Sequence, residues 1–176
     1  MANLCKELLA LKPAVVRGNA SEILALGAAT GKTQTRGVDS SHGAEDALPA
    51  ARAIASLHSC VVAVSGEVDF VTDGDCVAMV HNGDALLQAI TATGCSVTAL
   101  IAAFVVAARG TPESDLVATA HALAFFNVAA EAALERLPKP VGPGSFRVGL
   151  LDQLYLLRGE DIASRAKFGV YATRSD

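Results

Sequence analysis

The residues best suited to chemistry form a turn of small side chains from Thr91 to Ser96. The turn leads directly into an apolar run that ends near Ala108 and that we expect to form a helix. The unpaired N–H groups and the positive dipole end of a helix start make a ready site for anions. Cys95 lies at the mouth of this site, where a helix N-terminus stabilises a thiolate. An anion site beside a reactive group suggests phosphoryl transfer, although a cysteine packed beside small core residues is the alternative.

A second cluster, Arg17 to Glu22, follows a short apolar run that predicts a buried strand. Ligands of α/β sheets usually bind at the carboxyl ends of strands, and the planar guanidinium of Arg17 suits a phosphate. Asn19 and Glu22 are three residues apart, so a helical turn would place both side chains on one side, where their oxygens could hold Mg²⁺ directly or through water. A second explanation stays open, in which Asn19 caps a helix and Glu22 faces the positive end of that helix.

A third cluster, Ser65 to Asp69, ends the most apolar stretch of the chain. The hydroxyl of Ser65 could donate a hydrogen bond to a nucleotide phosphate, and Gly66 leaves room for that phosphate. An ordinary turn between a strand and a hairpin would explain the same residues. All three clusters lie at the ends of expected elements, so they could face one another.

Composition and charge exclude several classes of protein. The chain has 176 residues, a net charge of −4 and a pI near 5.5, without the basic footprint of nucleic-acid binding. Its first residues lack the apolar core of a signal peptide. The apolar run from Ser96 to Ala108 is too short to cross a bilayer, so we expect it to form a buried helix. The four cysteines are widely separated, which argues against a zinc site and a disulfide framework. We therefore expect a cytoplasmic protein with no nucleic-acid and no membrane partner.

Hydrophobic patterning and turn residues predict an alternation of helices and strands. Asp73 to Asp75 predict the tight turn of a hairpin. Thr111 to Ser114 supply an N-cap, a first-turn proline and an acidic residue, so they predict the start of a long helix. The expected helices are 3–11, 20–26, 45–57, 96–108, 111–137 and 146–157, the expected strands are 13–17, 58–65, 68–72 and 76–81, and residues 27–43 are expected to form a loop.

This order predicts an α/β fold in which helices cover a mostly parallel sheet. The length indicates a single domain over residues 1–176. The patterning shows only two convincing central strands and a hairpin, which is few for a three-layer domain. The sheet is therefore expected to be incomplete.

The three clusters, in this order, resemble the hydroxyethylthiazole kinases, which are ribokinase-like enzymes of thiamine biosynthesis and salvage. The resemblance covers nearly the whole chain except its C-terminal end. It implies a three-layer αβα ribokinase-like fold, of which this chain would be the C-terminal portion. The segments that carry it are Lys12 to Glu22, Gly37 to Ser40, Val64 to Gly74, Thr91 to Ser96 and Gly142 to Phe146.

The resemblance also implies an activity: transfer of the γ-phosphate of ATP to the hydroxyl of 4-methyl-5-(2-hydroxyethyl)thiazole, with Mg²⁺. Arg17 and Ser65 would contact ATP, and the family more often has threonine at the latter position. Asn19 and Glu22 match the magnesium-associated motif of the family. These roles follow from the resemblance alone.

The turn from Ala92 to Cys95 would then hold the reacting groups. Ala92 occupies a position where the family often has a glycine that touches the thiazole alcohol through its backbone. Thr93 and Gly94 match the anion hole. Cys95 occupies the position where most ribokinase-like enzymes have an aspartate base, so its thiolate would orient the alcohol and accept its proton.

The family has further βα units before the helix that ends at Lys12, and these units contribute substrate contacts, central strands and part of the subunit contact. Because the family is trimeric with active sites between subunits, we expect a homo-oligomer. The chain is expected to be a fragment, a form completed by another chain, or a form that has lost activity. Two other functions stay open: a non-catalytic remnant that binds nucleotide or joins full-length subunits, and a kinase of a different small alcohol.

Overall fold

The computed structural model describes residues 7–30 and 43–170. Residues 7–10 are helical, and Pro13 and Ala14 lead from them into the first strand. The remaining elements are, in chain order, β1 Val15–Asn19, α2 Ala20–Ala29, η1 Ala44–Ala47, α3 Leu48–His58, β2 Val61–Ser65, β3 Asp69–Thr72, β4 Val77–Val80, η2 Ala85–Ala89, α4 Thr93–Ala107, α5 Asp115–Arg136, α6 Pro143–Leu156, α7 Gly159–Arg165 and β5 Phe168–Val170.

The five strands form one sheet in the order β1-β2-β3-β4-β5. Only β1 and β2 are parallel, with Asn19 opposite Ser65, and the other three pairs are antiparallel. The expectation of a mostly parallel sheet was therefore wrong. A parallel pair needs a long crossover, and short turns join β2 to β3 and β3 to β4 instead.

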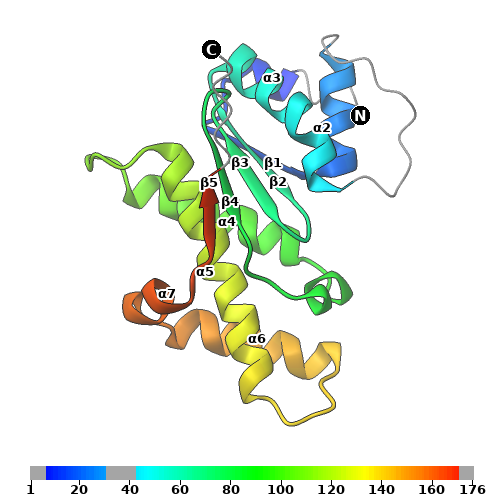
Figure 1. Ribbon diagram of the computed structural model, residues 1–176, viewed down its shortest axis with the longest axis vertical. Coiled ribbons are helices and arrows are strands. Elements are labelled where there is room, and N and C mark those ends of the chain that lie inside the picture. The colour runs from blue at the N-terminus through cyan, green and yellow to red at the C-terminus, as the bar shows by residue number, and fades with distance from the viewer. Residues whose placement is uncertain (1–6, 31–42, 171–176) are drawn as a thin grey trace.

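Helices cover both faces of this sheet, so the three-layer αβα arrangement is confirmed. The helices α2 and α3 lie on one face, while α4 and α5 lie on the other (Figure 1). Ile23, Ile54 and Val64 belong to the buried cluster under α2 and α3. A second buried cluster lies between the sheet and α5, and α6 packs against α5 below the sheet rather than on it.

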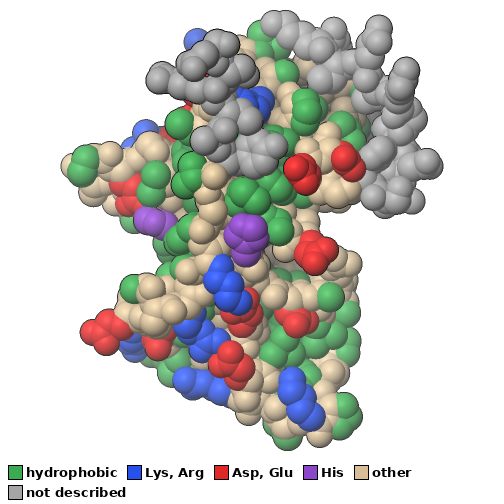
Figure 2. Space-filling model, viewed as in Figure 1, with side chains coloured by type: hydrophobic (Ala, Val, Ile, Leu, Met, Phe, Trp, Pro, Cys, Tyr) green, Lys and Arg blue, Asp and Glu red, His purple; other side chains and the backbone are tan. Residues whose placement is uncertain are grey.

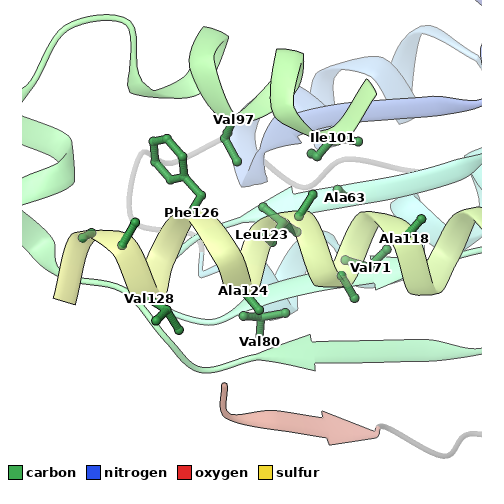
Figure 3. Packing of buried hydrophobic residues seen from close by; sticks show 14 of the residues in the cluster. Ala63, Val71, Val80, Val97, Ile101, Ala118, Leu123, Ala124, Phe126 and Val128 are labelled. Atoms are coloured by element: carbon green, nitrogen blue, oxygen red, sulfur yellow. The ribbon is translucent and has the colours of Figure 1, made fainter. Parts of the chain in front are cut away.

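The long helix α5 is the centre of the second cluster. Leu123 and Phe126 point toward Val97 on α4, while Ala124 and Val128 lie against the strand that carries Val80 (Figure 3). Within the described residues, α5 is the one helix long and apolar enough to cross a membrane, and 72% of that apolar stretch is buried inside the protein. Burial of this kind is typical of a core helix.

Helix α4 differs from the expected buried helix. Val97, Ile101 and Val105, spaced four residues apart, form its one buried stripe. Its opposite face is apolar and open, with Val106 70% exposed. The expectation that this whole segment is buried was wrong, because small and branched apolar residues continue around the helix.

Several expected boundaries also shift. His58 ends α3 instead of opening a strand, and Ser59 follows it in a left-handed conformation with φ of 52°. The long helix starts after Ser114, whose hydroxyl caps it by accepting a hydrogen bond from the amide of Val117. The hairpin turn at Asp73 is confirmed: its carboxylate accepts hydrogen bonds from the amides of Asp75 and Cys76. The short elements α7 and β5 were not predicted.

Candidate active site

The three sequence clusters meet at one cavity of about 700 Å³. Because β1 and β2 are parallel and in register, Asn19 and Ser65 end side by side at the same edge of the sheet. The start of α4 contributes Thr93 and Gly94 to the lining. The other side of the cavity is built from β3, η2 and α5 and the segment between β4 and η2, and its residues include Asp69, Asn82, Gly83, Asp84, Leu87, Gln88, Leu123, Phe126 and Asn127.

Arg17 lies directly against the start of α4. A Cβ added to Gly94 would stand 2.8 Å from Nη1 of Arg17, so only glycine lets the guanidinium approach the helix this closely. Nε of Arg17 is buried and has no hydrogen-bond partner among the described residues. Buried donors are nearly always paired in native proteins. An unpaired guanidinium donor beside a cavity is therefore well suited to an anionic ligand.

The start of α4 leaves its own donors available. Ser96 donates the first hydrogen bond of the helix to the carbonyl of Ala92, at 2.9 Å, so the amides of Thr93, Gly94 and Cys95 have no partner within the helix. No side chain caps this end, and Ala92 adopts a left-handed conformation with φ of 72°. The hydroxyl of Thr93 donates instead to the carbonyls of Leu87 and Ile90. Only the backbone at Thr93 can therefore serve an anion hole.

Asn19 and Glu22 form a reciprocal capping box at the start of α2. Oδ1 of Asn19 accepts from the amide of Glu22 at 2.9 Å, and Oε2 of Glu22 accepts from the amide of Asn19 at 2.8 Å. The capping interpretation of this pair is confirmed. Glu22 keeps further lone pairs, whereas Oδ1 of Asn19 also accepts a hydrogen bond from the hydroxyl of Ser21 at 2.8 Å and so has both lone pairs engaged. One or two carboxylates together with phosphate oxygens and water form a common setting for Mg²⁺. No cluster of three acidic, histidine or cysteine ligands occurs within residues 7–30 and 43–170.

Strand β3 begins with a carboxylate, that of Asp69, whose role the sequence did not reveal. Ser65 is half-buried and donates to the carbonyl of Gly18 at 3.3 Å. Asp69 is only 6% exposed and accepts hydrogen bonds from the amide of Gly66 and from Nδ2 of Asn127. Burial raises the pKa of Asp69, while these two hydrogen bonds and the charge of Arg17 oppose that rise.

Cys95 lies on the first turn of α4 and is exposed. Its side chain is not among the residues that line the cavity, although its neighbour Gly94 is. The thiol is thus beside the anion site and open toward solvent. Cys60 and Cys76 are free thiols elsewhere in the fold, and burial raises the pKa of Cys60.

Asn82, Asn127 and Glu131 are the residues of this region that the sequence clusters missed. Asn82 is 2% exposed and follows β4, whereas Asn127 and Glu131 lie one turn apart on α5. Two polar residues spaced four apart inside an alanine-rich apolar helix are a usable signal, because a buried polar side chain needs partners. Residues 37–40, which carry part of the resemblance, lie outside the described residues.

The surface shown in Figure 2 carries mixed charge. Acidic and basic side chains are interspersed over the lower half of that face, among the described residues, and no broad basic patch lies there. The mixed pattern provides no single-sign surface for a polyanion on that face.

Comparison with known proteins gives a consistent result. A sequence model of the Hydroxyethylthiazole kinase family matches residues 2–160. A hydroxyethylthiazole kinase of Zea mays is 52% identical over 94% of this chain and 58% of its own length, and one of Arabidopsis thaliana is 47% identical over 92% and 56%. The solved structure of a hydroxyethylthiazole kinase protein from Pyrococcus horikoshii OT3 superimposes with a TM-score of 0.81 at 35% identity, over 97% of this chain and 60% of that one.

The chain therefore spans less than two thirds of the length of each of these relatives. Within that span, the family match includes Arg17 in β1, Ser65 at the end of β2, Gly94 at the start of α4 and the buried Asn82. Arg165 and Lys167 lie beyond the matched residues. With a match over most of its length and a shared fold, this chain belongs to the hydroxyethylthiazole kinase family.

Proposed function

We propose that this chain binds ATP in the cavity and transfers its γ-phosphoryl group to the hydroxyl of 4-methyl-5-(2-hydroxyethyl)thiazole. The observation that carries the proposal is the contact between Arg17 and the start of α4. There a buried guanidinium N–H without a partner among the described residues lies beside a helix start whose first three amides have no partner within the helix. Donors arranged this way stabilise the charge on a transferring phosphoryl group. The choice of this alcohol as the substrate rests on the names of the relatives.

In the proposed reaction, the alcohol oxygen attacks the γ-phosphorus in line, the bond to the β–γ bridging oxygen breaks, and ADP leaves. Arg17 and Ser65 hold the nucleotide phosphates, while Thr93 and Gly94 supply amides of the anion hole and the backbone at Ala92 touches the alcohol. Cys95, as thiolate, accepts the proton that the alcohol loses. Its exposed position beside Gly94 leaves room for the alcohol to approach from outside the cavity.

We propose that Asn19 and Glu22 hold Mg²⁺ next to the phosphates that Arg17 binds, Glu22 through its free lone pairs and Asn19 by giving up the hydrogen bond from Ser21 to the cation or its water. Their oxygens fit this hard cation, and the capping box fixes both side chains at the carboxyl end of β1. When bound, Mg²⁺ would neutralise charge on the phosphate oxygens. The protein side chains do the positioning.

The direct test is an assay of ADP formation with and without the thiazole alcohol. ADP formation that requires the alcohol supports the proposal. ATP binding without any stimulation by the alcohol supports instead the alternative of a non-catalytic chain that binds nucleotide. Stimulation by a different small alcohol alone would indicate another substrate.

The variant Cys95→Ala tests the proposed base. Loss of a general base lowers turnover by about 10²-fold or more, while ATP affinity stays close to that of the wild type. Cys76→Ala is the matched control, because Cys76 is also an exposed free thiol but lies after the hairpin turn. Equal turnover of the two variants would remove Cys95 from the mechanism.

We further propose that the chain acts in the cytoplasm as a homo-oligomer, with three subunits by family resemblance. Val148, Leu151 and Tyr155 form an exposed apolar stripe along α6, with Tyr155 79% exposed, which supports a contact with another subunit. Light scattering after size-exclusion chromatography measures the subunit number.

A further inference from the structure

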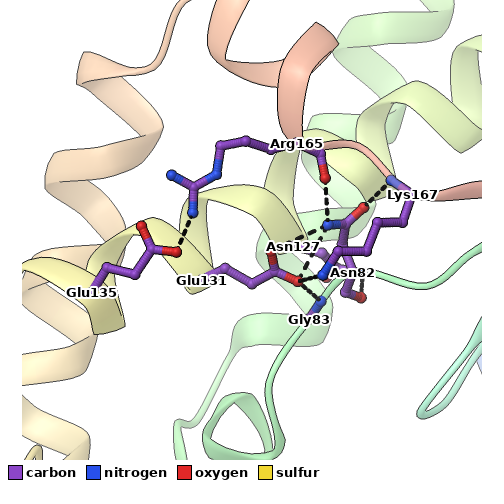
Figure 4. A network of polar contacts seen from close by, with 7 residues as sticks. All are labelled: Asn82, Gly83, Asn127, Glu131, Glu135, Arg165 and Lys167. Atoms are coloured by element: carbon purple, nitrogen blue, oxygen red, sulfur yellow. Dashed lines mark hydrogen bonds and ion pairs between the residues drawn. The ribbon is translucent and has the colours of Figure 1, made fainter.

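The far wall of the cavity is built around Asn82, whose side chain is fully engaged. Its Nδ2 donates to both carboxylate oxygens of Glu131 at 3.2 Å and to the carbonyl of Arg165 at 3.0 Å (Figure 4). Its Oδ1 accepts from the amide of Lys167 at 2.7 Å. Two segments far from Asn82 in the sequence, one on α5 and one at the end of α7, therefore converge on this amide side chain, which is 2% exposed.

Glu131 also fixes the backbone next to Asn82. Its Oε1 accepts from the amide of Gly83 at 3.0 Å, and Nζ of Lys167 lies 3.6 Å from the same oxygen. Gly83 has φ of 133°, a conformation that side-chain-bearing residues rarely adopt. The carboxylate of Glu131 thus holds a turn that only glycine accommodates easily.

From Asn82 the contacts continue toward the phosphate side of the cavity. Nδ2 of Asn127 donates to the carbonyl of Asn82 at 2.9 Å and to Oδ2 of Asp69 at 2.8 Å. Oδ1 of Asp69 in turn accepts from the amide of Gly66 at 3.0 Å. Gly66 is the neighbour of Ser65, so the chain of contacts ends at the turn expected to hold nucleotide.

We propose that Glu131 is a positioning residue: through Asn82, Asn127 and Asp69 it holds the turn at Ser65 and Gly66 in the conformation that binds nucleotide. The proposal rests on the proposed function for its ligand. It goes beyond that function because it concerns how the binding turn is held: Glu131 does not line the cavity and acts through other residues. Both hydrogens of the Asn127 amide are used and the Asn82 side chain is fully bonded, so the linkage has little freedom to rearrange.

The test compares Glu131→Gln with Glu135→Gln in the full 176-residue chain. Glutamine has the size of glutamate and can keep one oxygen on the amide of Gly83, but its NH₂ group then replaces Oε2 and faces Nδ2 of Asn82, and the negative charge beside Lys167 is lost. Glu135 is the matched control: it lies on the same helix and binds Arg165 at 2.6 Å, yet it touches neither Asn82 nor Gly83 (Figure 4). Both substitutions disturb the C-terminal segment, and only the first disturbs the cavity wall.

Two measurements test separately whether the hydrogen-bonded linkage holds the turn and whether the turn binds ATP. The first is amide hydrogen exchange without ligand, read at Gly66 and Gly83 and referenced to Ile54, which lies in α3 away from the network. We expect exchange at both glycines to rise about tenfold in Glu131→Gln and less than twofold in Glu135→Gln. The second is the dissociation constant of ATP, which we expect to rise about tenfold in the first variant only.

Unchanged exchange at Gly66 in Glu131→Gln, or equal effects of the two variants, would overturn the proposal whatever the ATP affinities are. Failure of the wild-type chain to bind ATP would count against the proposed function, and the exchange at Gly66 would still decide whether the linkage exists. If Glu131→Gln does not fold, Glu131→Asp retracts the carboxylate by one methylene group and is read by the same criteria.

Discussion

The two sides of the cavity are built in different ways. The phosphate side consists of short local motifs: Arg17 lies in β1 and keeps an unpaired donor, the half-buried Ser65 ends β2, and Gly94 lies in the first turn of α4. The far side consists of buried polar side chains that bind one another across 45 to 85 residues of sequence. The first side is open to a ligand, whereas the second is already saturated by the protein. Substitutions should therefore change ligand binding on the first side and folding stability on the second.

The largest effect is expected from Asn127→Asp. The change is isosteric, but it replaces the donor that now lies 2.8 Å from Oδ2 of Asp69 with a second carboxylate. A buried, uncompensated charge costs about 3–5 kcal/mol of unfolding free energy. The loss should shrink at acidic pH, where the two carboxyl groups can share a proton. Urea denaturation at two pH values measures it.

Asn19→Asp provides the control for stability, because it makes the same substitution on the phosphate side. Aspartate caps a helix as well as asparagine does, so the unfolding free energy should change by less than about 0.5 kcal/mol. Similar losses from both substitutions would erase the proposed contrast between the two sides.

The next effect concerns ligand binding on the phosphate side. In Gly94→Ala the new methyl group would stand 2.8 Å from Nη1 of Arg17 and displace the guanidinium. Loss of charge-assisted hydrogen bonds to phosphate should weaken ATP binding by about 10- to 100-fold. Calorimetric titration measures the dissociation constant. Gly144→Ala is the control, since a Cβ there meets nothing within 4 Å. The affinity of this variant for ATP should match that of the wild type.

The same contrast explains what the sequence could predict. Local motifs revealed the phosphate side: Arg17 in a short apolar strand, a glycine turn after Ser65 and a helix start at Thr93 can all be predicted from neighbouring residues. The order of helices and most boundaries followed from hydrophobic patterning. The hairpin of β3 and β4 followed from its turn residues, but the short strand β5 did not, because β5 pairs with β4 through contacts that no local pattern encodes. The partners of Asn82 could not be predicted for the same reason.

Asp69 predicts a pH dependence. Burial raises its pKa in the folded protein, so between the ordinary aspartate range and the higher folded value the native state binds more protons than the unfolded state. This contribution to stability is complete at acidic pH and is lost as the pH rises through the folded pKa. The unfolding free energy of the wild type minus that of Asp69→Asn should therefore fall with rising pH and then become constant. A difference that rises with pH would contradict the assignment to burial.

The smallest effect is expected at Ala92, where the phosphate side carries its own local strain. Ala92 has φ of 72° and ψ of 7°, a left-handed conformation that costs a residue with a Cβ about 1–2 kcal/mol. Glycine removes this strain but adds about 0.5–1 kcal/mol of conformational entropy to the unfolded chain. Ala92→Gly should therefore raise the unfolding free energy by about 0.5–1 kcal/mol.

Ala99→Gly, on the exposed face of α4, is the control and should lower the unfolding free energy by about 1 kcal/mol, because there the backbone is helical. Opposite signs in chemical denaturation would show that the turn before α4 is held left-handed against the preference of its own residue, whereas equal losses would mean that Ala92 carries no such strain.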